Sequence, residues 1–556
     1  MEKVNPEITS ADQEQNDFVR RLSKSVELEV EKEEEALIEG LKDKKMNRWT
    51  VMVLVFFFLL AFIPRMYFIF GVSSPDNPGA GWFGDAYHHW QIAYLSKEIG
   101  FSKSFLRLWD LKGMEYFWGL SHPLFTIIAF MLTGSHSVAV ERSMTAFFGS
   151  VSVALIFLIV KRFWNTKVAV ASTLLAALNP VGVFNDGTGM VEPLGIPFLL
   201  LGVYLWPKRP FWAGFSFFVA LMARGEYWVF SIFLVGAMMA LTTKIKTDAK
   251  FLLGLGFFIP LLGYMKYLLD YTGNIAYPFY WNYVANIFGT WQLKPELTSS
   301  DILAKYEFLA IFIVSSLLSL LVIKKKPKGM FLYLLGLGNW VFLGATFGLG
   351  AYIKSYMSYV WYVRFMILPY AFLGICLAIF LFHTIPNIKY LKILDKIKIN
   401  WLILLTVLVV SQGTWIFIWK KYATTIPNWN LAVRLAKGIA DQYQGGGLLL
   451  MDGNPEITYA LVQKFGVKGR YIVGEMFDPY YYFTEEDPYS NWEDNRLVVL
   501  KWIKENNIRT IATYVQYDRY AKLVAHEPQY FTEAGSVPNS NIVIYKVNDK
   551  LYKDKI

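Results

Sequence analysis

The sequence predicts an α-helical polytopic membrane protein with an α/β domain at its C-terminal end. Of its 556 residues, 55% are hydrophobic and 18% are charged, whereas a soluble domain carries about 25% charged residues. Several stretches of about 18 to 22 residues contain almost no charge, and this is the length of a helix that crosses a bilayer. Beyond residue 420 or so, short β-branched runs alternate with helical patterns, which is typical of a small α/β domain.

Apolar segments of helical length predict about eleven membrane crossings, because a helix satisfies its own backbone hydrogen bonds in lipid. We place them near residues 49–71, 138–160, 168–184, 193–206, 211–223, 228–242, 251–269, 306–323, 330–350, 365–383 and 401–419. The apolar stretch 122–134 is too short to cross, so we expect an interfacial or re-entrant helix there. It lies in the first external loop, residues 72–137.

Basic residues in the short loops indicate the orientation. With a cytoplasmic N-terminus, every even-numbered turn is basic, for example at Lys161 and Arg162, as the positive-inside rule requires of cytoplasmic loops. Residues 1–48 then form a cytoplasmic N-terminal tail, residues 49–420 the transmembrane domain, and residues 421–556 an extracytoplasmic α/β domain. We expect a multi-pass integral membrane protein, located in the cell membrane.

The net charge and the cysteine count bear on nucleic acid as a partner and on disulfide bonds. The net charge is +10, but it falls in short loops between apolar segments, so it indicates topology and contact with membrane lipid rather than nucleic acid. The single cysteine, Cys376, excludes a disulfide within the chain.

In the C-terminal region we expect short strands with helices between them. Its β runs are expected at 448–451, 471–473, 510–513 and 542–547, with helical patterns at 492–505 and 517–525.

Ionisable residues gather in the loops that this topology places outside the cytoplasm. The run Asp85-Ala86-Tyr87-His88-His89 follows the first crossing, and an ionisable cluster at a membrane face is a hypothesis for a functional site. If residues 85–95 are helical, Asp85, His88 and His89 share one face. The same loop contributes His122, and the other external turns contribute Asp186, Glu192, Arg224, Glu226 and Arg364.

The chemistry of this set suits one reaction. A carboxylate beside imidazoles serves as a general base or as a metal site, and arginine stabilises phosphate. A carboxylate base with phosphate-neutralising cations at the external face of a membrane suits sugar transfer from a polyprenyl-phosphate donor to an acceptor.

Two motifs also carry a resemblance to known proteins. Asp85, Tyr87 and His89 match three of the five positions of the Asp-Pro-Tyr-Tyr-His motif of oligosaccharyltransferase catalytic subunits. The run His122-Pro123-Leu124 is similar to the His-Pro-Pro-Leu element of dolichyl-phosphate-mannose protein mannosyltransferases and bacterial lipid A aminoarabinose transferases. In order and spacing, most of residues 49–385 resembles the superfamily that contains both branches, the polytopic glycosyltransferases of the GT-C fold.

The resemblance implies roles for particular residues. Asp85 would be the catalytic carboxylate, Glu192 or Asp186 would supply a second acidic group, and Glu192 and His89 would complete the catalytic set. The implied substrate-binding residues are His88, His122, Asp186, Arg224, Glu226 and Arg364. The implied partners are a polyprenyl- or dolichyl-phosphate sugar donor and a glycan, lipid or protein acceptor. The mannosyltransferase branch needs no metal, whereas oligosaccharyltransferases use a divalent ion, and here Asp85, His89 and Glu192 would hold Mn2+ or Mg2+.

The chain departs from both branches. Ala86 stands where the mannosyltransferase branch has Glu, and the C-terminal region lacks the Trp-Trp-Asp-Tyr-Gly signature with which oligosaccharyltransferases bind their acceptor sequon. We therefore expect inverting transfer of a single sugar. The alternatives are oligosaccharyltransferase-like transfer of a lipid-linked glycan to protein, a lipid or sugar transporter, and a membrane-anchored binding protein with an external sensor domain. A transporter would place its polar residues near the bilayer midplane.

Overall fold

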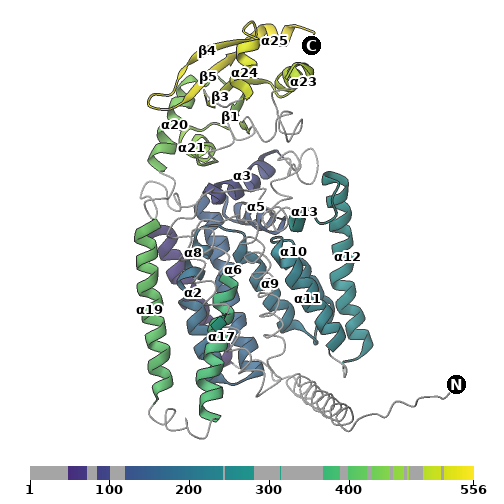
Figure 1. Ribbon diagram of the computed structural model, residues 1–556, viewed down its shortest axis with the longest axis vertical. Coiled ribbons are helices and arrows are strands. Elements are labelled where there is room, and N and C mark those ends of the chain that lie inside the picture. The colour runs from purple at the N-terminus through teal and green to yellow at the C-terminus, as the bar shows by residue number, and fades with distance from the viewer. Residues whose placement is uncertain are drawn as a thin grey trace, which may run out of the picture.

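The protein consists of a bundle of long helices with a small α/β unit beyond one end (Figure 1). The computed structural model describes residues 48–71, 84–99, 119–241, 245–280, 313–314, 367–387, 398–422, 429–450, 455–468, 472–474, 492–514 and 519–555. The predicted tail 1–48 lies outside these residues except for Arg48.

The bundle helices follow the predicted apolar segments. They are α2 (Arg48–Gly71), α6 (Val138–Phe163), α7 (Thr166–Ala177), α8 (Pro180–Gly187), α9 (Glu192–Leu205), α10 (Pro210–Leu221), α11 (Glu226–Leu241), α12 (Thr247–Thr272), α17 (Ile367–Ile379) and α19 (Ile399–Tyr422). The short helix α13 (Tyr277–Phe279) follows α12. Helices α3 (Gly84–Ile99) and α5 (Ser121–Thr133) lie between the bundle and the α/β unit (Figure 1).

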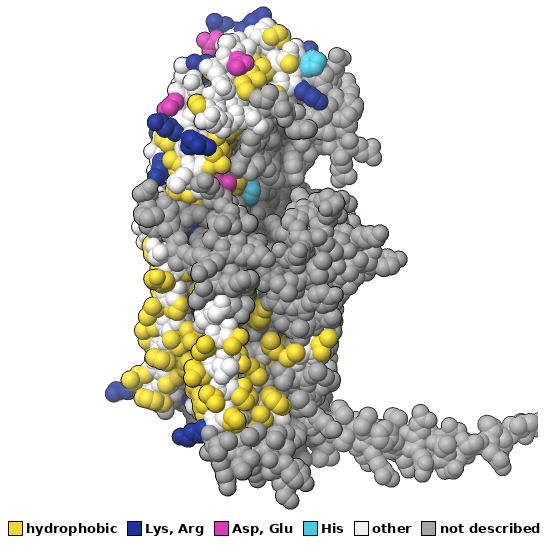
Figure 2. Space-filling model, turned by 60° about the vertical axis from the view of Figure 1, so that its left-hand side comes forward, with side chains coloured by type: hydrophobic (Ala, Val, Ile, Leu, Met, Phe, Trp, Pro, Cys, Tyr) yellow, Lys and Arg dark blue, Asp and Glu magenta, His cyan; other side chains and the backbone are white. Residues whose placement is uncertain are grey.

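The bundle has the length and surface of a membrane domain. Within the described residues, four helices are long and apolar enough to cross a bilayer, and a fifth crossing is obtained if α7 and α8 count as one bent span. Figure 2 shows hydrophobic side chains over the bundle, whereas the Asp and Glu side chains of this face lie toward the α/β unit. The protein is therefore a multi-pass membrane protein.

The count of about eleven crossings stays a prediction. Two of the predicted segments, 306–323 and 330–350, lie outside the described residues apart from 313–314. The predicted short helix at 122–134 is present as α5, which has 13 residues.

One predicted crossing differs from the structure. We expected a single helix over 168–184, but α7 and α8 meet at a bend of 52°. Proline cannot continue a helix, because its ring clashes with the preceding turn and it has no N–H to donate. Pro180 instead begins α8, and the Asn179 side chain caps that helix by accepting a hydrogen bond from the Val181 N–H.

The C-terminal unit is built on a five-stranded mixed sheet with the strand order β2-β1-β3-β5-β4. Its strands are β1 (Gly447–Leu450), β2 (Ile472–Gly474), β3 (Ile508–Tyr514), β4 (Phe531–Ser536) and β5 (Ile542–Val547). Strand β1 pairs in parallel with β2 and β3, whereas β5 pairs antiparallel with β3 and β4. The unit's helices are α20 (Trp429–Gln442), α21 (Pro455–Phe465), α23 (Trp492–Glu505), α24 (Arg519–His526) and α25 (Asp549–Lys553).

Most of this unit agrees with the expected α/β pattern, and the difference has a physical reason. The four predicted strands and two predicted helices are present within a few residues. Strand β4 was missed because it is an edge strand with only Phe531 buried, so its polar sequence lacks the alternation that marks a half-buried strand.

The apolar core continues from the bundle into the α/β unit. One cluster of buried side chains includes Phe157 of α6, Tyr87 of α3 and Tyr459 of α21. A second cluster, which includes Tyr520 of α24, fills the other side of the sheet. The α/β unit is thus packed onto the helical part rather than tethered to it.

Glycine permits a close helix contact between α10 and α12. A Cβ atom at Gly214 would lie 2.1 Å from the Leu253 carbonyl oxygen, and one at Gly256 would lie 2.1 Å from the Phe211 carbonyl oxygen. Small residues let membrane helices approach in this way.

We expect Gly256→Leu to destabilise the protein by about 1–3 kcal/mol or more, because its side chain would meet backbone that cannot move away. Gly263→Leu on the same helix is the matched control, since no atom of the described residues lies within 4 Å of a Cβ placed there. Thermal unfolding of the detergent-solubilised protein measures both variants. Equal melting temperatures for the two would contradict this packing.

Candidate active site

Helix α3 carries the cluster that the sequence singled out. Asp85 is its second residue, and His89 follows one helical turn later. The helix therefore bears out the condition under which Asp85, His88 and His89 share a face. His89 is buried and His88 is partly buried, whereas the side chain of Asp85 lies outside the described part of the structure.

His89 faces a second histidine, His122 of α5. Their ring centroids are 5.0 Å apart. His122 is fully buried, and its Nε2 atom lies 3.6 Å from Oε1 of Glu141 in the first turn of α6. Neither oxygen of Glu141 has a hydrogen-bond partner among the described residues. Three helices thus bring these polar side chains together at the end of the bundle nearest the α/β unit.

The beginning of α5 is tied to the end of α10, and this fixes His122. The Ser121 N–H donates to the Met222 carbonyl oxygen at 3.1 Å, and the Ser121 hydroxyl donates to the Val219 carbonyl oxygen at 2.9 Å. Gly119 has φ +109° and packs closely against the same carbonyl group. A Cβ atom at this position would lie 2.3 Å from the Met222 oxygen. Only glycine fits this approach.

Burial lowers the pKa of His122 from 6.5 to about 3. The Gly189 backbone and the negative charge of Glu192 act in the opposite direction but do not offset the loss of hydration. His122 is therefore neutral near pH 7, with one ring nitrogen as a donor and the other as an acceptor.

An arginine lies between two carboxylates beside this histidine pair. The Arg224 guanidinium contacts Glu192 through NH1, and its Nε atom lies 3.0 Å from Oε2 of Glu226. Glu192 begins α9 and Glu226 begins α11, so each carboxylate sits at a helix N-terminus, where negative charge is favoured. Glu192, Arg224 and Glu226 thus form a charged triad that joins the starts of α9 and α11.

Tyr227 holds the same two helices together. Its hydroxyl donates to the Glu192 carbonyl oxygen at 2.5 Å. Its ring lies directly over Gly195, where a Cβ would come within 2.2 Å. Tyr227 also lies within electrostatic reach of Asp186, so the triad and Asp186 belong to one polar region.

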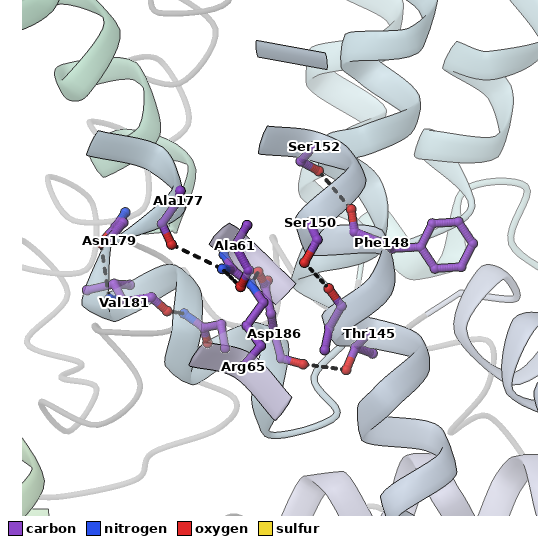
Figure 3. A network of polar contacts seen from close by, with 12 residues as sticks. Ala61, Arg65, Thr145, Phe148, Ser150, Ser152, Ala177, Asn179, Val181 and Asp186 are labelled. Atoms are coloured by element: carbon purple, nitrogen blue, oxygen red, sulfur yellow. Dashed lines mark hydrogen bonds and ion pairs between the residues drawn. The ribbon is translucent and has the colours of Figure 1, made fainter. Parts of the chain in front are cut away.

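Asp186 is engaged by an arginine of the first crossing (Figure 3). Its Oδ2 atom accepts a hydrogen bond from Arg65 Nε at 2.6 Å, and both side chains are about 2% exposed. Arg65 also donates to the carbonyl oxygens of Ala61 and Ala177, and the Thr145 hydroxyl donates to the Asp186 carbonyl oxygen. This network fastens α8 to α2 and α6.

Apart from the partly buried His88, the described site residues divide into a central group and a supporting pair. His89, His122, Glu192, Arg224 and Glu226 lie in one buried cluster. Asp186 lies at its side in the ion pair with Arg65. Arg364 lies outside the described residues, so its place stays a prediction.

The metal hypothesis also stays a prediction. Within the described part of the chain, no group of three or more His, Cys, Asp or Glu side chains is placed to hold a metal ion. The expected ligand set includes Asp85, whose side chain is not among those described, so only His89 and Glu192 of that set are placed.

Sequence reasoning missed three charged residues of this region. Arg65, Glu141 and Arg142 are all buried, and Arg142 lies over the Tyr87 ring at 5.9 Å. Arg65 carried a usable signal, because an ionisable residue inside an apolar crossing marks a polar partner. Glu141 and Arg142 were not selected as site residues, because they stand at the start of a helix, where charged residues are common.

Comparisons with known proteins bear on the fold. No protein-family model and no curated protein matches the sequence. The structure is similar to ArnT from Cupriavidus metallidurans in the apo state, with a TM-score of 0.50 and 13% identity over 91% of this chain and 99% of that one. This likeness bears on the fold alone, and the fold agrees with the GT-C fold that the resemblance implied.

Two further solved structures with lower TM-scores are oligosaccharyltransferases of Archaeoglobus fulgidus. The apo form has a TM-score of 0.46 and 11% identity over 88% of this chain and 73% of that one. AglB in complex with an inhibitory peptide and a dolichol-phosphate has a TM-score of 0.46 and 11% identity over 92% and 76%.

We expect Arg65 and Asp186 to be strongly coupled. Arg65→Met or Asp186→Asn alone should destabilise the protein by about 3–5 kcal/mol, because each leaves its partner buried without compensation. The double variant should lose much less than the sum, and chemical unfolding in detergent measures all three. Additive losses would contradict the coupling.

The pKa of His122 predicts an acid-sensitive stability. The unfolded state binds a proton below pH 6.5 and the folded state only below about 3, so the free energy of unfolding falls as the pH drops through this interval. By pH 5 the loss due to this group is about 2 kcal/mol. His122→Gln should remove that part of the pH dependence, whereas His526→Gln, an exposed histidine of α24, should leave it. Identical pH dependence in the wild type and His122→Gln would refute the assignment.

Proposed function

We propose that this protein is an integral-membrane inverting glycosyltransferase that moves a sugar from a polyprenyl-phosphate-linked donor to an acceptor on the extracytoplasmic side. The GT-C fold supports this proposal. The observation that carries it is helix α3, which brings the Asp85 backbone within one turn of His89 at the edge of a buried polar cluster. We further propose a cytoplasmic N-terminal tail, residues 1–48, and an extracytoplasmic α/β domain, residues 421–556.

Asp85 is the general base in the proposed reaction. Its carboxylate takes the proton of the acceptor hydroxyl, and the acceptor oxygen forms a bond to the anomeric carbon from the face opposite the phosphate. The bond from that carbon to the phosphate oxygen breaks at the same time, so the configuration inverts. Polyprenyl phosphate leaves with the electron pair, and no oxidant or reductant is needed.

The neighbours of Asp85 suit orientation of substrate hydroxyls. His122 is neutral near pH 7 because its pKa is about 3, so it acts as a hydrogen-bonding group rather than as a cation. His89 lies beside it, between His122 and the Asp85 end of α3. The roles of His88, His89 and His122 in this proposal are to bind and orient the acceptor or the sugar.

The described arginines bear on where the lipid phosphate binds. Arg65 is engaged by Asp186, and Arg224 contacts both Glu192 and Glu226. A phosphate would have to compete with these buried carboxylates for either guanidinium. We therefore assign Arg224 mainly to holding Glu192 and Glu226 in place, and Arg364 to the departing phosphate, where an oriented cation contributes several kcal/mol.

The donor and acceptor are proposed by class. The donor is a single sugar on a polyprenyl or dolichyl phosphate, and the acceptor is a glycan, lipid or protein with a free hydroxyl. Transfer of a lipid-linked glycan to protein is the alternative outcome, and it would be recognised by the mass added to the acceptor.

Asp85→Asn should reduce kcat by at least about a hundredfold, because the amide cannot accept the acceptor proton. Glu98→Gln, an exposed acidic residue on the same helix, is the matched control and should retain activity. The assay follows sugar transfer from a labelled polyprenyl-phosphate sugar by the purified protein in detergent or nanodiscs.

The control measurements separate this proposal from a transporter. Thermal unfolding of Asp85→Asn should match that of the wild type, which shows that the loss is chemical. Full transfer activity in Asp85→Asn would overturn the assignment of the base. Movement of the labelled lipid across the bilayer by the wild type, with no sugar transfer to any acceptor class, would overturn the proposed function.

A further inference from the structure

The face of α3 opposite His89 is aromatic and is directed at the α/β unit. Tyr87, Trp90 and Tyr94 recur at positions i, i+3 and i+7, which places them on one side of the helix. All three are buried. Helix α3 packs against α5 with its histidine side and against α21 with its aromatic side, so it is held between the bundle and the C-terminal unit.

Tyr459 of α21 is the centre of the aromatic contact. Its ring meets that of Trp90 edge-on, with the centroids 4.7 Å apart, and lies 5.4 Å from the Tyr87 ring. Trp429 of α20 lies 5.5 Å from Tyr459 and is parallel to the Tyr87 ring. Edge-to-face aromatic pairs of this kind add specific attraction to the burial of their area.

The loop between α5 and α6 closes the same junction through hydrogen bonds. The His136 carbonyl oxygen accepts from Trp90 Nε1 at 2.7 Å and from Gln463 Nε2 at 3.3 Å. The Tyr459 hydroxyl accepts from the Val138 N–H at 3.1 Å, at the start of α6. One short loop is therefore bonded both to α3 and to α21.

This junction adjoins the candidate active site. Arg142, one turn into α6, lies over the Tyr87 ring at 5.9 Å. Its side chain also packs on Gly189, where an added Cβ would lie 3.2 Å from Arg142 and 3.4 Å from Glu141. A shift of α3 away from α21 would therefore change the position of Asp85 relative to the cluster around Glu141 and His122.

From this geometry we propose that Tyr459 is a positioning residue, through which the C-terminal α/β unit holds α3, and with it Asp85, in register with the buried polar cluster. The inference rests on the proposed function for the role of Asp85. The α/β unit is then part of the catalytic scaffold, and Tyr459 acts through α3 without touching substrate.

Hydrogen exchange of the full-length protein tests the positioning directly. Tyr459→Ala should raise the exchange rates of the α3 amides, residues 86–99, by about tenfold or more, because the aromatic contacts that oppose local opening are lost. Tyr459→Leu should act in the same direction, and it remains informative if the alanine variant does not fold. Tyr459→Phe keeps the ring and should leave α3 exchange close to that of the wild type.

Tyr520→Ala is the matched control. Tyr520 is equally buried in the same unit, but it belongs to the core on the other side of the sheet. It should raise exchange in the sheet and leave α3 protected. Unchanged α3 exchange in folded Tyr459→Ala and Tyr459→Leu, or an equal rise in Tyr520→Ala, would overturn the proposal.

Sugar transfer supplies the second readout. Tyr459→Ala should lower kcat by about tenfold or more while the KM for the donor changes by less than about threefold, and Tyr459→Phe should restore kcat. Loss of donor binding with unchanged kcat would contradict a positioning role. Asp85→Asn should keep wild-type exchange in α3, so failure of the proposed function and failure of this inference give different results.

Discussion

Compensation of buried charge within an apolar bundle is the constraint on which the rest of the structure depends. A charge removed from water without a partner costs several kcal/mol, so the buried Arg65 and Arg224 restrict where the chain can place a carboxylate. Arg65 meets Asp186, and Arg224 meets Glu192 and Glu226. These contacts join α2 to α8 and α9 to α11.

The same constraint explains why the polar cluster and the α/β unit lie at one end. The helix starts that carry Glu141, Glu192 and Glu226 face the same side as α3 and α5. The α/β unit covers that side and buries the aromatic face of α3 against Tyr459. Helix α3 is thus bounded by polar groups on one face and by aromatic rings on the other, and Asp85 lies at its N-terminal end.

Much of this arrangement was predictable from sequence, because the length and the periodicity of an apolar segment depend on the residues within that segment. The short helix at His122 followed from the length of its apolar stretch, and a helix from Asp85 was considered only as a condition for a shared face. Glu192 and Glu226 were selected from their place in external turns. The break at Pro180 was missed because the apolar run continues through it. The pairing of Arg65 with Asp186 was missed because the two residues are 121 positions apart, and a pairing of that separation is set by the packing of three helices. The histidine pair was not predicted as a contact for the same reason.

Mapping where a polyprenyl phosphate binds tests the central claim most directly. A photoreactive polyprenyl phosphate would be crosslinked to the protein in nanodiscs, and the modified residues would be identified by mass spectrometry. We expect the phosphate end to label α3, the start of α5, or the turns that precede α9 and α11. Labelling confined to the opposite end of the bundle, around Lys161, Arg162 and Lys208, would contradict it.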